Sequence, residues 1–416
     1  MRIALVSDCY PPRLGGIEVQ VADLAAQLRT AGHHAVVITA TPGPSTPFVL
    51  RLPGPVSLGA PVGLGAGRAL AKVLARADVV HAHLGVLGPF AQRAAGIAAG
   101  QGVPTVLTWH SLPGSSPLAM ALAPGWRRLL EQGVNPTAVS SVAAEQLATL
   151  LRSASVPVLR NGLDLAGWSV DPGGSHLRPA DGKRTEDPGV LPPRVVSAMR
   201  FAVRKRPLRL VALMSRVRDL VPASRRPRLS ILGDGPWWAP LDVLVRSTPL
   251  REWVELPGRI PRERMADHLR SSDLYVAASR REAFGIAALE ARCAGLPVAG
   301  YAGSGVADLV DAGLGGVLAG SDREMANALA GLLTDPSRLA RYAAYHRSHP
   351  PLAHDWPVVT AATLRQYERA YRGGGPSRAD IGSVAVGADG ASEGSRPREV
   401  ARGAEATDAR TGSSPR

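Results

Sequence analysis

The sequence predicts an α/β protein of two doubly wound domains, each built around a largely parallel sheet. Three observations support this prediction. Short apolar runs of strand length alternate with segments of helical periodicity along most of the chain. A polar segment rich in Pro and Gly at residues 168–193 interrupts the alternation, which then starts again, so this segment is expected to be a linker. The length of 416 residues also exceeds what one hydrophobic core usually organises.

The first domain, residues 1–167, begins with an apolar strand at residues 3–6. The apolar residues from Ile17 to Leu28 then recur at helical spacing, and with the next strand they complete a right-handed parallel β-α-β unit. This domain is therefore expected to be Rossmann-like. Further strands are expected at residues 36–39, 78–83, 103–111, 138–141 and 156–159, helices at residues 118–130 and 142–151, and a loop at residues 42–66.

The second domain, residues 194–350, repeats the same alternation and is also expected to be Rossmann-like. A helix at residues 351–372 follows it. The Gly-, Ala- and Ser-rich segment 373–416 has almost no large apolar residues and is expected to be a disordered tail. The strands expected in this half are residues 194–198, 228–232, 254–257, 274–277 and 297–300, and the helices are residues 208–217, 265–271 and 287–293.

Composition limits the classes of partner. The net charge is +14, and residues 373–416 contribute six Arg against six Asp or Glu, so the excess belongs to the two domains. Such a charge suits anionic ligands and lipid surfaces. With 4% aromatic residues and no nucleic-acid-reading motif, no nucleic-acid partner is expected. The two cysteines give no disulfide framework and no apolar stretch is long enough to span a bilayer, so the expected location is the cytoplasm.

The segment from Arg281 to Glu290 carries the strongest site signal. Glu282 and Glu290 lie eight residues apart, and the helix expected at residues 287–293 begins between them. The unpaired amides and positive dipole end of a helix N-terminus bind phosphate readily. A bound diphosphate would repel carboxylates, so the two Glu are better suited to accept hydrogen bonds from sugar or ribose hydroxyls. The alternative is an amphipathic helix with a solvated Glu at each end.

Two further features lie at the ends of strands in the first domain. Gly15 and Gly16 follow the first strand, where residues without a Cβ let backbone amides approach a ligand, although a plain turn is the alternative. His110 follows a strand and points toward the same ligand-binding edge, with a hydrogen-bonded core histidine as the alternative. His81 and His83 are expected to face opposite sides of their strand, to be structural, and not to form a joint metal site.

Residues 118–130 combine apolar residues with Trp126 and the pair Arg127–Arg128. An interfacial Trp beside basic residues is typical of a peripheral membrane contact. An ordinary surface helix has the same composition and remains the alternative.

Together these motifs resemble the retaining glycosyltransferases of family 4 (GT4), which have the GT-B fold of two Rossmann-like domains facing across a cleft. The motifs occur in the family's order from residue 1 to about residue 320. The matching residues are Gly15 and Gly16; Asp78, Val79, Val80, His81, Ala82 and His83; Thr108, Trp109 and His110; Asn161, Gly162, Leu163 and Asp164; Arg200 and Lys205; Gly233, Asp234 and Gly235; and Glu282 and Glu290.

The resemblance implies transfer of a hexosyl group from a nucleotide diphosphate sugar, of the GDP-mannose, UDP-N-acetylglucosamine or UDP-glucose type, to an acceptor hydroxyl. The catalytic residues that it implies are His110, Arg200, Lys205 and Glu282. The donor-binding residues that it implies are Gly15, Gly16, Arg200, Lys205, Glu282, Phe284, Gly285 and Glu290. Other members often have Gly before the arginine of the phosphate loop, where this chain has Ala198 and Met199.

The implied roles follow the donor from its phosphates to its sugar. Arg200 and Lys205 clamp the diphosphate, which Gly15 and Gly16 also meet. Glu290 accepts hydrogen bonds from the ribose. Glu282 holds the donor sugar together with the amides of Phe284 and Gly285, and His110 lies near that sugar in the other domain.

The resemblance also implies that no metal ion and no other cofactor are needed, because Arg200 and Lys205 supply the positive charge. No Asp-x-Asp triplet, the metal-binding motif of the other major glycosyltransferase fold, occurs in the chain. In the implied mechanism the leaving phosphate oxygen takes the proton of the acceptor hydroxyl, so no separate base is required.

Residues 7–18 and 108–112 resemble in particular the family members that glycosylate phosphatidylinositol. The expected acceptor is therefore a lipid of this type, with contact at the inner face of the cell membrane; a soluble small molecule or a polysaccharide is the alternative acceptor. Other readings are a GT-B-like epimerase or phosphorylase and an inactive nucleotide-sugar-binding protein. The presence of His110, Arg200, Lys205 and both Glu argues against the inactive protein.

Overall fold

The computed structural model describes residues 1–13, 15–52, 64–85, 87–114, 117–153, 155–168 and 192–373, all of which belong to one compact unit. The expected linker at residues 168–193 and the expected tail at residues 373–416 lie outside the described residues, apart from Trp168, Pro192, Pro193 and Gly373.

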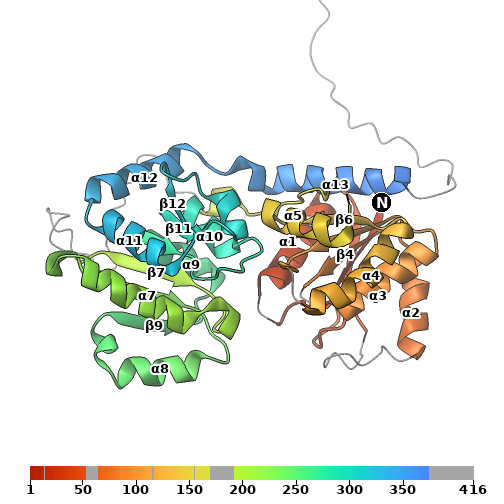
Figure 1. Cartoon of the computed structure of the whole chain (residues 1–416). Coiled ribbons are helices and arrows are strands. Elements are labelled where there is room, and N and C mark those ends of the chain that lie inside the picture. Colours follow the sequence, from red (N-terminus) through yellow and green to blue (C-terminus); the bar gives the residue numbers. More distant parts are fainter. Residues whose placement is uncertain are drawn as a thin grey trace, which may run out of the picture. The chain divides into compact units, whose positions relative to one another are not determined.

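Two six-stranded sheets organise this unit (Figure 1). Their strand orders are β3-β2-β1-β4-β5-β6 and β12-β11-β10-β7-β8-β9, and all neighbouring strands are parallel. The strands of the first sheet are β1 (Arg2–Ser7), β2 (His34–Thr39), β3 (Val49–Arg51), β4 (Val79–Leu84), β5 (Thr105–Trp109) and β6 (Asn135–Ala138). Those of the second sheet are β7 (Arg194–Ala198), β8 (Arg228–Leu232), β9 (Val254–Gly258), β10 (Leu274–Val276), β11 (Val298–Tyr301) and β12 (Gly316–Ala319).

Both sheets have the same doubly wound topology. In each, the strand order reverses between the first and fourth strands in sequence, which are β1 and β4 in one sheet and β7 and β10 in the other. Ligands of open parallel sheets bind outside the carboxyl ends of the strands at such a switch point. The topology therefore directs attention to the loops that follow these four strands.

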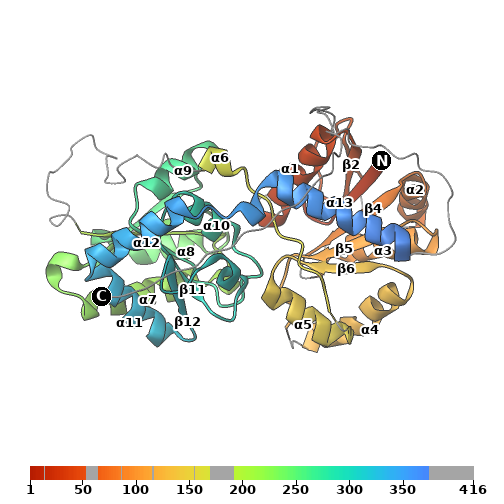
Figure 2. The same cartoon turned by 90° about the horizontal axis from the view of Figure 1, so that it is seen from above.

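Helices cover the faces of both sheets (Figures 1 and 2). The α-helices are α1 (Gly16–Thr30), α2 (Leu64–Leu74), α3 (Pro89–Gly100), α4 (Pro117–Glu131), α5 (Ser141–Leu151), α6 (Leu165–Trp168), α7 (Pro207–Leu220), α8 (Trp238–Arg246), α9 (Arg262–Arg270), α10 (Ile286–Cys293), α11 (Asp322–Leu333), α12 (Pro336–Ser348) and α13 (Trp356–Gly373). Short 3₁₀ helices are η1 (Val203–Lys205), η2 (Ala223–Arg225), η3 (Pro249–Glu252), η4 (Gly305–Leu309) and η5 (Leu352–His354).

Strand β1 shows why the inner strands are continuous apolar runs. Ile3 and Leu5 pack into one hydrophobic cluster, and Ala4 and Val6 pack into another on the opposite face. Because both faces of the sheet are covered, each alternate side chain is buried and none needs to be polar.

The last helix, α13, returns to the first sheet (Figures 1 and 2). Trp356 and Tyr367 belong to the same buried cluster as Ile3 and Leu5 of β1. Trp356 also packs on the backbone of Gly162, which the side chain of Gln20 fixes with two hydrogen bonds of 2.8 and 2.9 Å. The C-terminal helix therefore completes the core of the N-terminal sheet.

The main corrections to the expected elements concern the first sheet. The expected loop at residues 42–66 contains strand β3 and the start of α2, because a three-residue edge strand and a Gly-containing helix give too little periodicity to recognise. The strand expected at residues 138–141 is β6, which starts at Asn135. Its Pro136 is tolerated because β6 is an edge strand. Residues 156–159 form only a single bridge, between Ala138 and Val158.

Trp126 on α4 was expected to be interfacial, but it is buried. Its side chain is 2% exposed, it meets the ring of Trp109 edge to face with centroids 5.9 Å apart, and its Nε1 donates to Gln92 Oε1 at 2.9 Å. The indole is therefore part of the core. The exposed apolar residues of this helix are Leu118 and Met120, at 50% and 61% exposure.

The seat of Trp356 on Gly162 predicts that Gly162→Ala destabilises the chain. A Cβ at this position would lie 2.4 Å from the indole ring, so Trp356 would have to move out of the core. Overpacking of this kind costs about 1–3 kcal/mol of unfolding free energy. Urea unfolding curves of wild type and variant measure this difference. Gly125→Ala is the matched control, because a Cβ on this α4 residue meets nothing within 4 Å. Equal stability of the two variants would contradict the proposed packing.

Candidate functional site

The loops after β7 and β10 meet at the switch point of the second sheet. Ser197 Oγ donates to the carbonyl of Val276 at 2.6 Å, and Tyr275 OH donates to the carbonyl of Ala198 at 3.3 Å. Each bond joins the last residues of one strand to the other. The two strand ends are thus held together directly beneath the loops that carry Arg200, Lys205 and Glu282.

The glycines Gly233 and Gly235 bring a third loop against the one that carries Arg200. A Cβ on Gly233 would lie 2.0 Å from the carbonyl oxygen of Met199, and one on Gly235 would lie 2.6 Å from that of Phe201. Both residues have positive φ, 128° and 153°. The amide of Phe201 donates to the carbonyl of Asp234 at 2.9 Å. The glycines are therefore needed for close packing behind the Arg200 loop.

Lys205 and Glu282 form an ion pair across these loops. Their side chains are 24% and 20% exposed, so the pair is partly buried yet reachable from solvent. Arg200, on the same loop as Lys205, is exposed, and its guanidinium has no hydrogen bond or ion pair within the described ranges. The structure thus brings Lys205 and Glu282 together and leaves the Arg200 guanidinium open.

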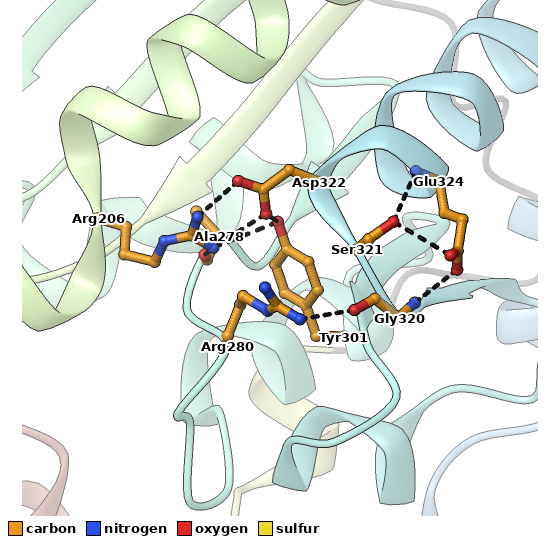
Figure 3. A network of polar contacts seen from close by, with 8 residues as sticks. All are labelled: Arg206, Ala278, Arg280, Tyr301, Gly320, Ser321, Asp322 and Glu324. Carbon is orange, nitrogen blue, oxygen red and sulfur yellow. Dashed lines mark hydrogen bonds and ion pairs between the residues drawn. The ribbon is translucent and has the colours of Figure 1, made fainter.

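The residue after Lys205 anchors this loop (Figure 3). Arg206 has φ of 61° and precedes α7, and its guanidinium donates to both carboxylate oxygens of Asp322, at 3.2 and 2.6 Å. Tyr301 OH donates to the same carboxylate at 2.7 Å. The hydrogen bond from Arg206 holds the pKa of Asp322 below its ordinary value. Asp322 is thereby an anionic anchor for the cationic loop.

The same network spans the loops after β10 and β12 and the last residue of β11 (Figure 3). Arg280 donates to the carbonyl of Gly320 at 2.7 Å, and its guanidinium lies 5.5 Å from the centre of the Tyr301 ring. Ser321 caps α11 by accepting from the amide of Glu324 at 3.2 Å. The segment leading to Glu282 is therefore fixed at its start.

The turn between Glu282 and α10 is held from the other side. Gly285 has φ of 93°, and the amide of Gly305 donates to the carbonyl of Glu282 at 2.8 Å. The Phe284 ring is 4% exposed and lies 5.3 Å from the His354 ring, so this side chain is structural. No residue within the described part of the chain accepts from the amides of Phe284 and Gly285. These amides, at the start of α10, are the groups available to a ligand.

Glu290 lies one turn further along α10. Burial raises its pKa to about 7, and the nearby positive charge of Arg262 opposes this effect. Arg262 itself donates to both carboxylate oxygens of Asp23 on α1, at 3.2 and 2.8 Å. Burial is the main cause that raises the pKa of Tyr275, and the negative charges of Glu282 and Glu290 raise it further. Both carboxylates therefore act on this one residue.

The loop after β1 contributes the N-terminus of α1. Gly15 precedes the helix without a side-chain cap, and its backbone is extended, with φ of 164°. A Cβ on Gly15 would lie 2.3 Å from Glu18 Oε2, whereas one on Gly16 would make an ordinary contact of 3.6 Å with Ile286. Gly16 thus meets the first residue of α10. Arg200 is also close enough to oppose the rise in the pKa of Glu18 that burial causes.

Two residues of this region were missed by sequence reasoning. Asp8 accepts from the amides of Phe90 and Ala91, both at 3.0 Å, and so joins the loop after β1 to the start of α3. Gln20 holds Gly162, as described above. Pro89 at the first position of α3 was a usable signal for a helix start, whereas nothing local to Gln20 indicates a partner 142 residues away.

The histidines at the ends of β4 and β5 form a cluster. His83 Nδ1 and His110 Nε2 lie 3.0 Å apart, and the rings of His81 and His83 have centroids 4.1 Å apart. The expectation that His81 and His83 face opposite sides was wrong, because residues two apart on a strand share a face. No group of three or more His, Cys, Asp or Glu suited to a metal ion occurs in the described ranges.

The predicted site residues thus form two sets of contacts, Lys205 with Glu282 and His110 with His83. No hydrogen bond or ion pair among described residues joins these sets to each other or to Glu290. No described helix is long and apolar enough to cross a membrane.

Comparison with known proteins gives the chain a family. A family model described as Glycosyltransferase Family 4 matches residues 14–166, and one described as Glycosyl transferases group 1 matches residues 186–349. A D-inositol 3-phosphate glycosyltransferase of Thermobispora bispora is 30% identical over 322 residues, which cover 71% of each chain. A glycogen synthase of Mycobacterium tuberculosis is 26% identical over 418 residues, covering 90% of this chain and 96% of that one.

Solved structures share the fold. The Anabaena protein HepE, in complex with UDP, superposes with a TM-score of 0.67 at 17% identity, covering 89% of this chain and 100% of that one. Sucrose-phosphate synthase of Thermosynechococcus elongatus has a TM-score of 0.67 at 21% identity, covering 89% of this chain and 99% of that one. With two doubly wound sheets, both family models and the 30% identical relative in agreement, the chain belongs to the GT4 family and is a glycosyltransferase of the GT-B fold.

Proposed function

We propose that this glycosyltransferase moves a hexosyl group, with retention of configuration, from a nucleoside diphosphate sugar to an acceptor hydroxyl. The observation that carries the proposal is the Lys205–Glu282 pair beside the open amides that begin α10. A cation, a carboxylate and a helix N-terminus at one switch point match a ligand with a phosphate end and a hydroxyl-bearing end.

A bound donor would give Lys205 and Glu282 new partners in place of each other. Without donor, Lys205 and Glu282 neutralise each other. A bound diphosphate offers Lys205 a stronger anion, and the sugar hydroxyls offer Glu282 hydrogen-bond donors. The open guanidinium of Arg200 adds a second cation on the same loop. Negative charge grows on the diphosphate as the glycosidic bond breaks, so fixed cations stabilise the transition state more than the bound donor.

The other site residues take the remaining parts of the donor. Glu290 accepts from the ribose hydroxyls, and the amides of Phe284 and Gly285 bind the sugar or its phosphate. Gly15 and Gly16 meet the phosphates through backbone amides at the start of α1, and His110 hydrogen-bonds the sugar. In the retaining route, the leaving phosphate oxygen accepts the proton of the acceptor hydroxyl.

We propose that no metal ion takes part. The supporting observations are the positions of Arg200 and Lys205 on one loop and the absence of an Asp-x-Asp triplet from the sequence. Arg200 and Lys205 supply the charge that a divalent ion supplies in other glycosyltransferases.

For the acceptor we propose an inositol that carries a phosphate. Several relatives, including one from Catenulispora acidiphila that is 28% identical over 398 residues, are named D-inositol 3-phosphate glycosyltransferase. A phosphatidylinositol headgroup and a free inositol phosphate share this group. The exposed Leu118 and Met120 on α4 favour a contact with lipid. A glucan acceptor is the second candidate, because another relative is named glycogen synthase.

A transfer assay tests the proposal. UDP-glucose, UDP-N-acetylglucosamine and GDP-mannose are each offered in excess EDTA with one acceptor: myo-inositol 3-phosphate, phosphatidylinositol vesicles or a glucan primer. One donor is expected to release its nucleotide only with an inositol-containing acceptor. Proton NMR of the product is expected to show the anomeric configuration of the donor.

The outcomes separate the alternatives. Donor binding without nucleotide release would identify an inactive binding protein, and inversion at the anomeric carbon would contradict the retaining route. Loss of transfer in EDTA that Mg²⁺ or Mn²⁺ restores would contradict metal independence. Transfer to vesicles but not to the soluble acceptor would select the lipid, and transfer to glucan alone would replace the inositol proposal.

The ion pair predicts a separation between activity and stability in Lys205→Ala. Loss of the cation at the diphosphate is expected to lower kcat by a factor of about 10²–10³. A partly exposed ion pair contributes about 1 kcal/mol or less to stability, so the unfolding midpoint should change little. Steady-state kinetics and urea unfolding measure the two effects. Arg246→Ala is the control, since it removes a cation from the pair with Asp242 on α8. If Lys205→Ala and Arg246→Ala change kcat and the unfolding midpoint by equal amounts, Lys205 is only structural.

The raised pKa of Glu290 predicts pH-dependent donor binding. A carboxylate accepts hydroxyl hydrogen bonds better than a carboxylic acid, so donor affinity should rise with pH through about 7. Without donor the sign is opposite: the raised pKa favours the folded state in acid, and this advantage is lost as pH rises through about 7. Calorimetric titration of the active nucleotide sugar at pH 6 and pH 8 should show up to about a tenfold difference in Kd. Glu290→Gln should abolish the difference; its persistence there would assign it to another group.

A further inference from the structure

The hydrogen bond between His83 and His110 has no part in the proposed function. His83 belongs to β4 and is 3% exposed, and His110 follows β5. Their ring centroids lie 5.3 Å apart at an angle of 40°, with His83 Nδ1 3.0 Å from His110 Nε2. The amide of His110 donates to the carbonyl of Leu84 at 2.8 Å. Both the backbone and the ring of His110 are therefore held by the end of β4.

A bond between two imidazole nitrogens contains one proton. Burial lowers the pKa of His83 well below its ordinary value and that of His110 to about 4, so both rings are neutral near pH 7. One ring donates and the other accepts. In either arrangement His110 uses Nε2, and only Nδ1 remains for a substrate.

The neighbouring His81 differs because both of its nitrogens have protein partners. Nδ1 lies 3.0 Å from Tyr367 OH, and Nε2 lies 2.7 Å from Thr108 Oγ1. Thr108 is in turn 2.6 Å from Thr137 Oγ1. His81 is thus fixed from two sides and packs its ring against that of His83.

The second nitrogen of His83 has no such protein partner. Nε2 is buried and has no hydrogen-bond partner among the described residues. A cavity of about 20 Å³ is lined by this histidine together with Gln20, His110, Asn161 and Trp356. This volume holds one water molecule, which can bond Nε2 and complement either tautomer of the pair.

We propose that His83 is the positioning residue for His110: its hydrogen bond to Nε2 fixes the orientation of that ring, so that Nδ1 is the atom presented to the donor sugar. The inference rests on the proposed role of His110 in donor binding. His83 touches neither donor nor acceptor and acts only through the imidazole of His110. Partners of this kind commonly change activity by factors of about 10–100 when they are removed.

Three substitutions of His83 separate positioning from packing. Asn places an amide near the position of Nδ1, Gln places one near Nε2, and Leu offers neither. His83→Leu and His83→Gln are expected to lower kcat about 10–100-fold with little change in KM for the donor, whereas His83→Asn restores kcat to within about threefold of wild type. An Asn variant no more active than the Leu variant would overturn the proposal, as would full activity of the Leu variant. If His83→Leu does not fold, the comparison of Asn with Gln decides.

His346 provides the matched control. It is also 3% exposed, its Nδ1 lies 2.6 Å from the carbonyl of Leu296, and its Nε2 is buried without a partner in the described part of the chain. His346→Leu should lower the unfolding midpoint without lowering kcat. An equal loss of kcat in the His346 and His83 variants would reduce the His83 effect to packing.

A second readout does not depend on activity. Nitrogen-15 NMR of the full chain with labelled histidine reports the protonation and hydrogen bonding of each ring nitrogen, with His110→Asn used for assignment. Wild type and His83→Asn are expected to show the signal of a hydrogen-bonded His110 Nε2 near pH 7, and His83→Leu a displaced signal for this nitrogen. An unchanged His110 signal in His83→Leu would overturn the proposal. If no donor is turned over, the proposed function fails while this spectrum still decides the positioning role.

Discussion

The ion pair between Lys205 and Glu282 is the interaction on which the account of this site depends. Two partly buried side chains of opposite charge come from loops after β7 and β10, at the point where the strand order of the second sheet reverses. A pair of this kind contributes little to folding. In the proposed function both groups are held ready, each neutralising the other until a ligand with an anionic end and a hydroxyl-bearing end separates them.

Much of the surrounding structure serves to hold those two loops. Gly233 and Gly235 let the loop after β8 lie against the carbonyls of the Arg200 loop, and Arg206 ties the same loop to Asp322. Gly305 fixes the carbonyl of Glu282 from the opposite side. The first sheet uses a different device, a neutral histidine pair, and depends on α13 from the end of the chain to complete its core. The charged groups of the candidate site thus come from loops of the second sheet, and its neutral histidines come from the first.

Sequence patterns were sufficient for the parts of the fold that repeat. Inner strands buried on both faces are continuous apolar runs, so β1, β4, β7 and β8 were found almost to the residue. The edge strand β3 was missed, and β6 was expected three residues too late in the chain. A short strand with one neighbour needs little apolar character, so its pattern is weak. The packing of α13 on the first sheet joins residues more than 280 apart, such as His81 and Tyr367, and no local pattern encodes it.

For the candidate site, sequence reasoning named residues but not their contacts. Spacing singled out Glu282 and Glu290 and the family resemblance added Lys205, whereas the anchoring role of Arg206 depends on a partner 116 residues away. The face shared by His81 and His83 follows from strand geometry alone and was misjudged. The roles of Gly233 and Gly235 are visible only in the structure, because these residues leave space for a backbone segment that the sequence does not locate.

The most direct test exchanges the two charges, in the double variant K205E/E282K. The exchange keeps an ion pair between the same loops but places the carboxylate where the diphosphate should bind. The account predicts an unfolding midpoint close to that of wild type together with loss of nucleotide-sugar binding in calorimetric titration. A double variant that binds the donor as tightly as wild type would show that the pair only fastens the loops, and would contradict the account.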